Sequence, residues 1–368
     1  MKGLRAVIVA AGLGLALASA RAAYLESDGG PRAEPPELVP PRPVPPLPPR
    51  PGPGLGLREL VQRVQVGAPH SYRRLTVYPL LLRGGGRRDA LTLDEALSCG
   101  DLVVREREQG EVARVMVSNE SRRPVFLMAG EILLGGRQNR IVRDDVLLPP
   151  HSGFVAIPVY CGEQDRWQGP EPVFKSAGAL AAPSVRRMAG AAESQDRIWR
   201  EIDGQLAQAE VRAPTRSYQQ LYDDARLKGE LDRCVAEFRP CCPPETVGCV
   251  ILDGWRILGV ELFSDASLFD RLWPRIIRSY GAPVVCREVP ADLPRWDERR
   301  EWGGDRIRGF LNSLLDAGFA PRYTPGLGEL FDIRGPAHGT GLEEGGGLVH
   351  AAAFPEVYDL RPLREDRR

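Results

Sequence analysis

The chain has 368 residues, of which 43% are hydrophobic and 27% are charged, with 49 basic and 49 acidic side chains. This apolar content excludes a chain that is disordered throughout, and the length is enough for one large or two ordinary domains. A net charge of zero and 7% aromatic residues argue against a nucleic-acid partner, because such proteins usually carry a concentrated basic surface.

The first 23 residues have the pattern of an export signal. Lys2 and Arg5 precede an uncharged run at residues 6–18, and the small residues Ser19 and Ala20 follow it. This combination is typical of a cleaved signal peptide. The run is shorter than the about 20 apolar residues that a transmembrane helix needs. We therefore expect a periplasmic or secreted protein, with an uncleaved N-terminal anchor as the alternative and no other membrane segment.

Residues 24–56 form a predicted linker. The segment 31–53 contains 12 prolines in 23 positions. Proline has a fixed φ and no backbone donor, so this composition favours an extended polyproline II conformation. We expect a disordered spacer, followed by a single large domain at residues 57–360. A sub-division of that domain near residues 170–184 is the alternative.

Residues 57–167 are predicted to be mostly strands. Thr92 and Glu95 form a capping-box pattern, which predicts one short helix among them. Pro158 predicts that its strand is at an edge or bulged, because proline cannot donate to a ladder. The predicted strands are residues 75–82, 112–117, 125–134, 141–148 and 154–161.

Residues 184–238 change to a helical periodicity of apolar side chains. Ser217 and Gln220 form a second capping-box pattern within this region, and Pro240 ends its last helix.

The remainder of the chain mixes strands and helices. Asp253-Gly254 predicts a two-residue hairpin turn, and Gly318 is predicted to be the left-handed cap of a helix. The predicted strands are residues 247–252, 255–262, 329–334 and 348–354, and the predicted helices are residues 268–280 and 307–315. The fold class is therefore α+β, with a strand-rich N-terminal half packed against a helix/strand C-terminal half and no regular βαβ alternation.

The seven cysteines are read in the light of the predicted export to an oxidising compartment. Cys234, Cys241, Cys242 and Cys249 lie within 16 residues of one another. In an oxidising compartment such a group favours a local disulfide, whose connectivity the sequence does not give. A zinc site is disfavoured because there is no CxxC pair and no nearby histidine. We expect neither a metal nor a cofactor.

Glu131 is the main candidate functional residue, since the common catalytic and cofactor signatures are absent from the sequence. It lies in the apolar run 125–134, which resembles a central strand buried on both faces. A carboxylate in such surroundings needs a partner or a proton. Arg137, Gln138 and Arg140 are the nearest candidates. The group is either a structural ion pair or a general base beside a cationic ligand-binding site.

Asp145, Glu163 and Trp167 are the further candidates. Asp144 and Asp145 are expected to point to opposite faces of a strand, so that only one of them shares a pocket with Glu131. Glu163 could add acid–base capacity, and Trp167 could stack on a ligand or cover the core. Cys161 as a nucleophile with His151 as its base is less favoured in an exported protein. His350, in an apolar strand, is expected to be a hydrogen-bonded core residue.

The chain resembles the ARG-and-rhodanese-phosphatase-superfamily-associated protein domain family over residues 60–355. The matching motifs are Tyr78-Pro79-Leu80, Leu91-Thr92-Leu93-Asp94-Glu95-Ala96, Pro124-Val125-Phe126-Leu127, Ala129-Gly130-Glu131-Ile132-Leu133, Gly135-Gly136-Arg137-Gln138, Leu147-Leu148-Pro149-Pro150 and Cys161-Gly162-Glu163. The family is uncharacterised. Its name records association with ADP-ribosyl-glycohydrolase and phosphatase-like domains, which implies a context of nucleotide-derived ligands without specifying an activity.

Two functions remain open on these residues. The first is an exported module that binds a small molecule or a protein, with Glu131, Arg137, Gln138 and Arg140 in its polar site. The second is a hydrolase in which Glu131, with Asp145 or Glu163, performs acid–base chemistry on a nucleotide- or sugar-phosphate-like substrate. A purely structural role for the charged residues is the third reading.

Overall fold

A nine-stranded antiparallel sheet forms the centre of the computed structural model, which describes residues 52–107, 112–166, 173–285, 287 and 296–355. All of these belong to one compact unit, residues 50–368. The predicted signal peptide and almost all of the predicted linker lie outside the described residues. The first element, helix α1, begins at Leu55.

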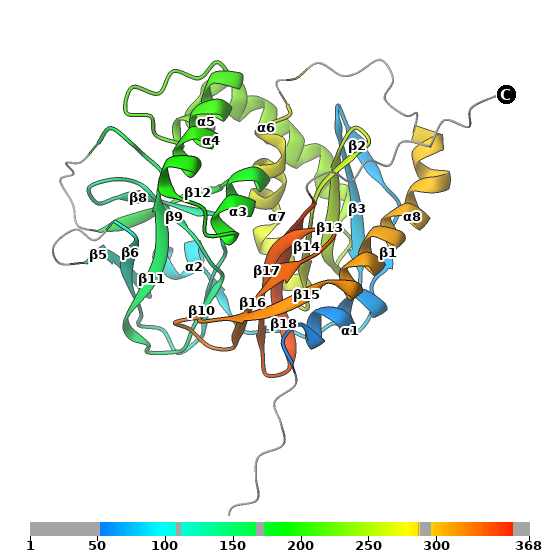
Figure 1. Cartoon of the computed structure of the whole chain (residues 1–368), viewed down its shortest axis with the longest axis horizontal. Coiled ribbons are helices and arrows are strands. Elements are labelled where there is room, and N and C mark those ends of the chain that lie inside the picture. Colours follow the sequence, from blue (N-terminus) through cyan, green and yellow to red (C-terminus); the bar gives the residue numbers. More distant parts are fainter. Residues whose placement is uncertain (1–51, 108–111, 167–172, 286, 288–295, 356–368) are drawn as a thin grey trace, which may run out of the picture. The chain divides into compact units, whose positions relative to one another are not determined.

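The order of the nine-stranded sheet is β1-β3-β13-β14-β18-β17-β16-β15, with β2 also paired to β3. The chain therefore places a strand from its beginning beside strands from its last third (Figure 1). The strands are β1 (Gln65–Val66), β2 (His70–Tyr72), β3 (Leu75–Leu81), β13 (Thr246–Asp253), β14 (Arg256–Phe263), β15 (Gly318–Arg322), β16 (Glu329–Arg334), β17 (His338–Glu344) and β18 (Gly347–Phe354).

Helices cover both faces of this sheet. Val250 and Leu252 pack into one core with α1 (Leu55–Arg63) and α8 (Trp296–Ser313), which continues into the 3₁₀ turn Leu314–Asp316. Cys249 and Ile251, which alternate with them along β13, pack into a second core with α6 (Ala225–Phe238) and α7 (Ala266–Gly281). Because side chains alternate between the faces of a strand, a continuous apolar run is what a sheet buried on both sides requires.

A second group of strands lies between β3 and β13 in the sequence, and we call residues 90–180 the strand unit. Its two sheets have the orders β10-β7-β4 and β12-β8-β9-β11-β6-β5. An isolated bridge between Arg105 and Val173 joins the two ends of the larger sheet. Its elements are β4 (Leu91–Thr92), α2 (Leu93–Ser98), β5 (Leu102–Glu106), β6 (Arg114–Asn119), β7 (Val125–Leu127), β8 (Glu131–Gly135), β9 (Arg140–Val142), β10 (Val146–Leu148), β11 (Gly153–Cys161) and β12 (Phe174–Leu180).

Helices α3 (Pro183–Gly190), α4 (Gln195–Gln208) and α5 (Gln220–Asp223) follow the strand unit and lead to α6. Their apolar stripes, together with Ile132 and Ile141 of the strand unit, form a third core. None of the helices in the described ranges has the length and apolar character needed to cross a bilayer.

The α+β class and several local predictions are confirmed. Thr92 and Glu95 form both hydrogen bonds of the capping box that starts α2. The predicted hairpin joins β13 and β14, but its two turn residues are Gly254, with a φ of 61°, and Trp255, one position later than predicted, because Asp253 still pairs with Arg256. The predicted helical region, residues 184–238, contains α3 to α6.

Other predictions are wrong for identifiable reasons. The runs 125–134 and 141–148 are each two short strands, because Gly130 turns the chain at a φ of 97° and residues 143–145 leave the ladder. Pro158, expected at an edge or a bulge, lies in a strand that is interior by the sheet order, but residues 153–158 pair with β6 alone and only residues 159–161 pair with β9, so the edge is present locally. The Ser217 hydroxyl accepts from Asn139, so it does not cap α5. Gly318 starts β15, a strand that was missed together with β17.

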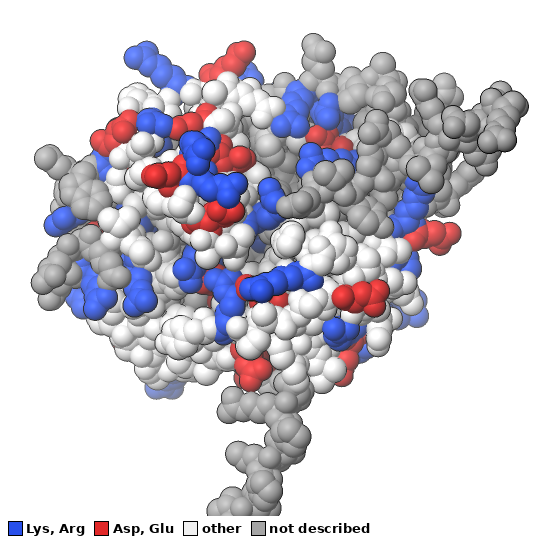
Figure 2. All heavy atoms as spheres, in the orientation of Figure 1, with Lys and Arg blue, Asp and Glu red and all other residues white. Residues whose placement is uncertain are grey.

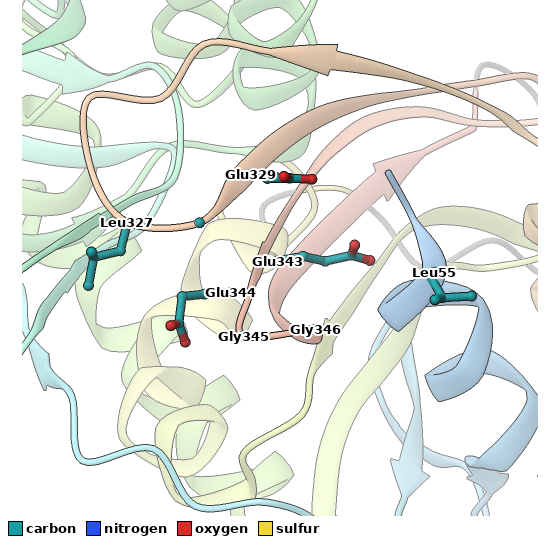
Figure 3. Close-up of a pocket in the computed structure, with 8 residues that line it drawn as sticks. Leu55, Leu327, Glu329, Glu343, Glu344, Gly345 and Gly346 are labelled. Atoms are coloured by element: carbon teal, nitrogen blue, oxygen red, sulfur yellow. The ribbon is translucent and has the colours of Figure 1, made fainter. Parts of the chain in front are cut away.

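Helix α1 is held to the sheet by hydrogen bonds to Glu343 of β17. Figure 3 shows Glu343 of β17 pointing towards the start of α1 near Leu55, whereas Glu344 points away from it. The Glu343 carboxylate accepts from the backbone N–H groups of Gly54, at 3.2 Å, and Leu57, at 2.9 Å. Gly54 is the N-cap and has no side chain, so Glu343 supplies the acceptor that a capping residue normally provides.

Candidate functional site

Six buried charged or ionisable side chains meet where the strand unit contacts the nine-stranded sheet, and we call them the central cluster. Two come from the strand unit, two from the sheet and two from helices. Each is at most 8% exposed. They are Glu131 and Asp145, Glu261 of β14 and His350 of β18, and Arg186 of α3 and Arg275 of α7.

A tight turn positions Glu131 at the start of β8. The Glu131 carboxylate accepts from the Met128 N–H at 3.0 Å. Gly130, between them, has a φ of 97°, and a Cβ at this position would lie 2.7 Å from the Arg186 side chain. Arg186 uses this space to donate to the Ala129 carbonyl at 3.1 Å. Glycine is therefore required here for both conformation and close approach.

The cation beside Glu131 is Arg275, whose Nη1 lies 2.5 Å from Oε1. Arg275 also pairs with Asp94, in the first turn of α2. Burial raises the pKa of Glu131 to about 8, the Met128 N–H opposes this, and the charge of Asp145 adds to it. Burial also lowers the pKa of Arg275 to about 10. Because the guanidinium lies in direct contact, it favours the ionised carboxylate against the cost of desolvation.

His350 links the strand unit to the sheet. Its Nδ1 lies 2.7 Å from Asp145 Oδ2, and its Nε2 lies 2.9 Å from Glu261 Oε2. Burial disfavours the charged ring, but Asp145 and Glu261 outweigh it and raise the pKa of His350 to about 9. The imidazolium has a donor on each nitrogen, so the protonated ring satisfies both carboxylates.

Glu261 is held in its ionised form by three partners. Arg186 forms a bidentate pair with it, and its Nη2–Oε2 distance is 3.1 Å. The Tyr280 hydroxyl donates to Oε1 at 2.8 Å. Burial alone would raise the pKa of Glu261, but Arg186 and His350 lower it to about 2. The same carboxylate, opposing burial, raises the pKa of Arg186.

The cluster is closed to solvent: Glu131, Asp145, Glu261 and His350 are each at most 1% exposed. It combines three carboxyl groups with two guanidinium groups and the imidazolium of His350, and Arg275 also pairs with Asp94 outside the cluster. A general acid or base must come within hydrogen-bond distance of a substrate proton. Both nitrogens of His350 and both carboxylate oxygens of Asp145 already have protein partners. The geometry therefore suits a structural joint.

The other predicted site residues lie in a second group, the Arg140 cluster. Arg140 pairs with Glu106 at 3.1 Å and donates to the Gln138 carbonyl, so it is not the partner of Glu131 that the sequence suggested. Gln138 donates to the Gln164 carbonyl, and the Arg137 backbone N–H donates to Glu106.

Glu163 also belongs to the Arg140 cluster. Its carboxylate accepts from the Asn139 N–H at 3.2 Å and pairs with Arg166 at 2.7 Å. The structure thus brings Asp145, and not Glu163, to Glu131. Asp144 turns away to pair with Arg322 and Arg143. Both aspartates lie in the turn between β9 and β10, not in a strand.

The remaining candidates do not add to either cluster. Trp167 lies outside the described residues. Cys161 ends β11 and its thiol is buried, which raises its pKa, while the exposed His151 precedes the other end of that strand. Cys241 and Cys242 have sulfurs 3.4 Å apart without a bond between them. A disulfide in this region stays a prediction.

On the face of the molecule drawn in Figure 2, neither acidic nor basic side chains form a large surface of one charge. Figure 2 shows both kinds interspersed over the visible face. Three glutamates, Glu329, Glu343 and Glu344, line a pocket of about 300 Å³. Glu343 is committed to α1, and Glu344 pairs with Arg88. Within the described ranges, no group of three metal-ligating side chains has the geometry to hold an ion.

Sequence reasoning missed Arg186, Glu261 and Arg275. Glu261 stands between Val260 and Leu262 in a predicted strand, which is the same signal that identified Glu131. His350 is the hydrogen-bonded core histidine that its apolar strand predicted. The two arginines lie in amphipathic helices, where nothing in the local pattern distinguishes a buried guanidinium from an exposed one.

Comparison with known families gives one match. A family model described as the ARG and Rhodanese-Phosphatase-superfamily-associated Protein domain matches residues 63–354, which is most of the chain. Searches of curated proteins and of solved structures gave no match.

Replacing Arg275 by Gln should lower the free energy of unfolding by about 3–5 kcal/mol, because it breaks the pair with buried Glu131 and the pair with Asp94 at the same time. Urea denaturation measures this loss. Arg278→Gln is the matched control on the same helix, since Arg278 pairs with Asp232 at the surface and should cost at most about 1 kcal/mol. Equal losses in the two variants would contradict the importance of the pair.

The raised pKa of His350 predicts a pH dependence of stability. A pKa that folding raises from 6.5 to about 9 stabilises the folded state below pH 6.5, and the contribution disappears as the pH rises through 9. The stabilisation at stake is about 3 kcal/mol. Unfolding free energies measured between pH 6 and pH 9.5 should fall in both proteins, because the raised pKa of Glu131 acts in the same direction up to pH 8, but they should fall by about 3 kcal/mol more in the parent than in His350→Gln. Parallel profiles would show that the ring is not charged.

Proposed function

The chain belongs to the ARG and Rhodanese-Phosphatase-superfamily-associated Protein domain family, and we propose that it is a binding module and not a hydrolase. One observation carries the proposal. Glu131 and Asp145, the two acids that lie close together, are each 1% exposed and already bonded to protein groups. The central cluster then serves to hold the strand unit against the sheet, and binding takes place elsewhere on the rigid body so formed.

The hydrolase alternative requires two acids that converge on an open cleft. Glu131 and Asp145 converge but are sealed, and Glu163 is engaged by Arg166 in the other cluster. Asp94 lines an open pocket of about 660 Å³ between α2 and β12. Asp94 is also paired with Arg275, and the pocket wall offers Lys175 and serines in place of a second acid.

A rigid body of this kind suits binding. Sites whose side chains are held by packing and by further hydrogen bonds lose less entropy when a ligand is bound. The cluster connects α3, α7, β14 and β18 with the strand unit through Arg186, Arg275, Glu261 and His350. Surfaces formed by these elements are therefore fixed relative to one another.

The proposal includes export, which is supported by Lys2, Arg5 and the apolar run that follows. The intact mass of the protein recovered from the periplasm or the medium should correspond to a chain that begins after Ala20 or Ala22. Recovery of a chain that retains residues 1–20, in the cytoplasm, would contradict export.

Enzyme assays with Glu131→Gln test the central proposal. The parent should release no more product than buffer from chromogenic phosphate esters and glycosides, and Glu131→Gln should lower the melting temperature. Glu237→Gln, an exposed glutamate on α6, is the stability control. A turnover shown by the parent and lost in a Glu131→Gln protein that is folded at the assay temperature would overturn the proposal.

A further inference from the structure

Two adjacent cysteines lie in the short link between helix α6 and strand β13, and we call them the cysteine pair. Cys241 ends the 3₁₀ turn Arg239–Cys241, and Cys242 follows as the C-cap of that turn. The Sγ atoms of the two residues are 3.4 Å apart and share a hydrogen bond. Both residues are partly exposed, which leaves them open to small molecules in solution.

Prolines and hydrogen bonds constrain the backbone around the cysteine pair. Pro240 precedes the pair, and Pro243 and Pro244 follow it. Each proline fixes its own φ and restricts the residue before it. The Pro243 carbonyl accepts from the N–H of Thr246, the first residue of β13, and from its hydroxyl at 2.7 Å. The proximity of the two sulfurs is therefore imposed by the local chain.

The other two cysteines of this region are inaccessible. Cys234 of α6 and Cys249 of β13 are fully buried in the second core, against which the cysteine pair packs. Burial raises the pKa of Cys234 to about 12, and it also raises the pKa of Cys249 well above its usual value. Buried thiols that keep their protons are inert. Thiol chemistry in this region is therefore confined to the cysteine pair.

The environment of Cys242 sets an order of reaction within the pair. Its hydrogen bond with Cys241 and its burial raise the pKa of the Cys242 thiol. Because a thiolate and not a thiol attacks a disulfide, Cys242 is poorly suited to the first attack. Cys241 therefore reacts first, and the Cys242 sulfur lies 3.4 Å away for the second step.

A bond between adjacent residues suits reversible chemistry better than it suits stabilisation. The entropy that a disulfide removes from the unfolded chain grows with the length of the loop, and this loop is the shortest one possible. Adjacent Cα atoms are about 3.8 Å apart, closer than the about 4.4–6.8 Å of ordinary disulfides. Departures from the ordinary geometry make a disulfide easier to reduce. A disulfide within the cysteine pair is therefore easily reversed.

We propose that the cysteine pair is a reversible redox site that exchanges with low-molecular-weight disulfides and thiols. Cys241 attacks a disulfide RSSR, forms a mixed disulfide with one R–S group and releases one RSH. Cys242 then attacks the Cys241 sulfur, which closes the Cys241–Cys242 bond and releases the second RSH. The pair loses two electrons to RSSR, and its two protons leave on the two RSH molecules. Two RSH molecules reverse the sequence.

This inference goes beyond the binding function proposed above and does not depend on it. The cysteine pair takes no part in the central cluster or in the Arg140 cluster. Its reaction partners are defined by their sulfur chemistry alone.

Oxidised glutathione tests the proposal on the full chain. After incubation, the remaining thiols are alkylated under denaturing conditions, and the chain is digested with a protease that cleaves after glutamate. Cleavage after Glu237 and Glu245 leaves the cysteine pair alone in fragment 238–245, separate from Cys234 and Cys249. By mass, this fragment should lack two hydrogen atoms and carry no alkyl group. Subsequent treatment with excess reduced glutathione should restore two alkylation sites.

A variant and an internal control test the order of the steps. Cys242→Ser removes the second step, so fragment 238–245 of this variant should retain one glutathione on Cys241, whereas the parent should retain none. Cys99 is the control, because it is exposed and is the single cysteine of fragment 96–106. Cys99 should retain glutathione in both proteins, which shows that the reagent has reacted.

Four results would overturn the proposal. The first is full alkylation of fragment 238–245 in a parent whose Cys99 has reacted. The second is a parent fragment that retains glutathione, and the third is a disulfide that joins this fragment to Cys234 or Cys249. The fourth is a bond that excess reduced glutathione does not open, since that bond would be structural. Each of them leaves the proposed binding function standing, because that function fails through turnover that depends on Glu131.

Discussion

The fold depends on charged groups buried between its two sets of strands. Moving a carboxylate or a guanidinium out of water is costly, and the cost is recovered only where opposite charges meet in good geometry. Glu131 and Asp145 approach from the strand unit, and Arg186, Glu261, Arg275 and His350 approach from the other side. A displaced interface would leave bare charges in the interior. The cluster therefore favours one way of docking the two parts over others.

The sequence predicted local structure well and long-range partners poorly. The Thr92 capping box and the hairpin at Gly254 depend on neighbouring residues; both are present, the turn one residue later than predicted. The burial of Glu131 beside a cation followed from its apolar neighbours, but the cation is Arg275, which the tertiary fold brings from a distant helix. The alternation argument for residues 125–134 failed because one glycine reverses the chain. β17 was missed because its glycines resemble a loop.

Helix α3 connects the central cluster with a neighbouring cavity. Successive arginines on this short helix lie in different surroundings: Arg186 pairs with Glu261 in the central cluster, and Arg187 lines the cavity between α3, α4 and the hairpin of β13 and β14. Because the first is fixed by a bidentate pair, the second is presented from a helix that cannot easily shift. A change in the buried network would thus alter the geometry of the cavity without touching its lining.

The placement of the strand unit between β3 and β13 governs how the protein can be made. β3 and β13 are hydrogen-bonded neighbours, yet the whole of residues 90–180 is synthesised between them. The strand unit can pair as soon as it leaves the ribosome, because all its strands lie in one continuous segment. The edge of β3 that pairs with β13 stays unpaired until the last third of the chain has been synthesised. Such non-local pairing is slow, and the unpaired apolar edge is prone to aggregation in the meantime. A newly made chain therefore lacks the β3–β13 pairing at the centre of its largest sheet until Thr246–Asp253 has been synthesised.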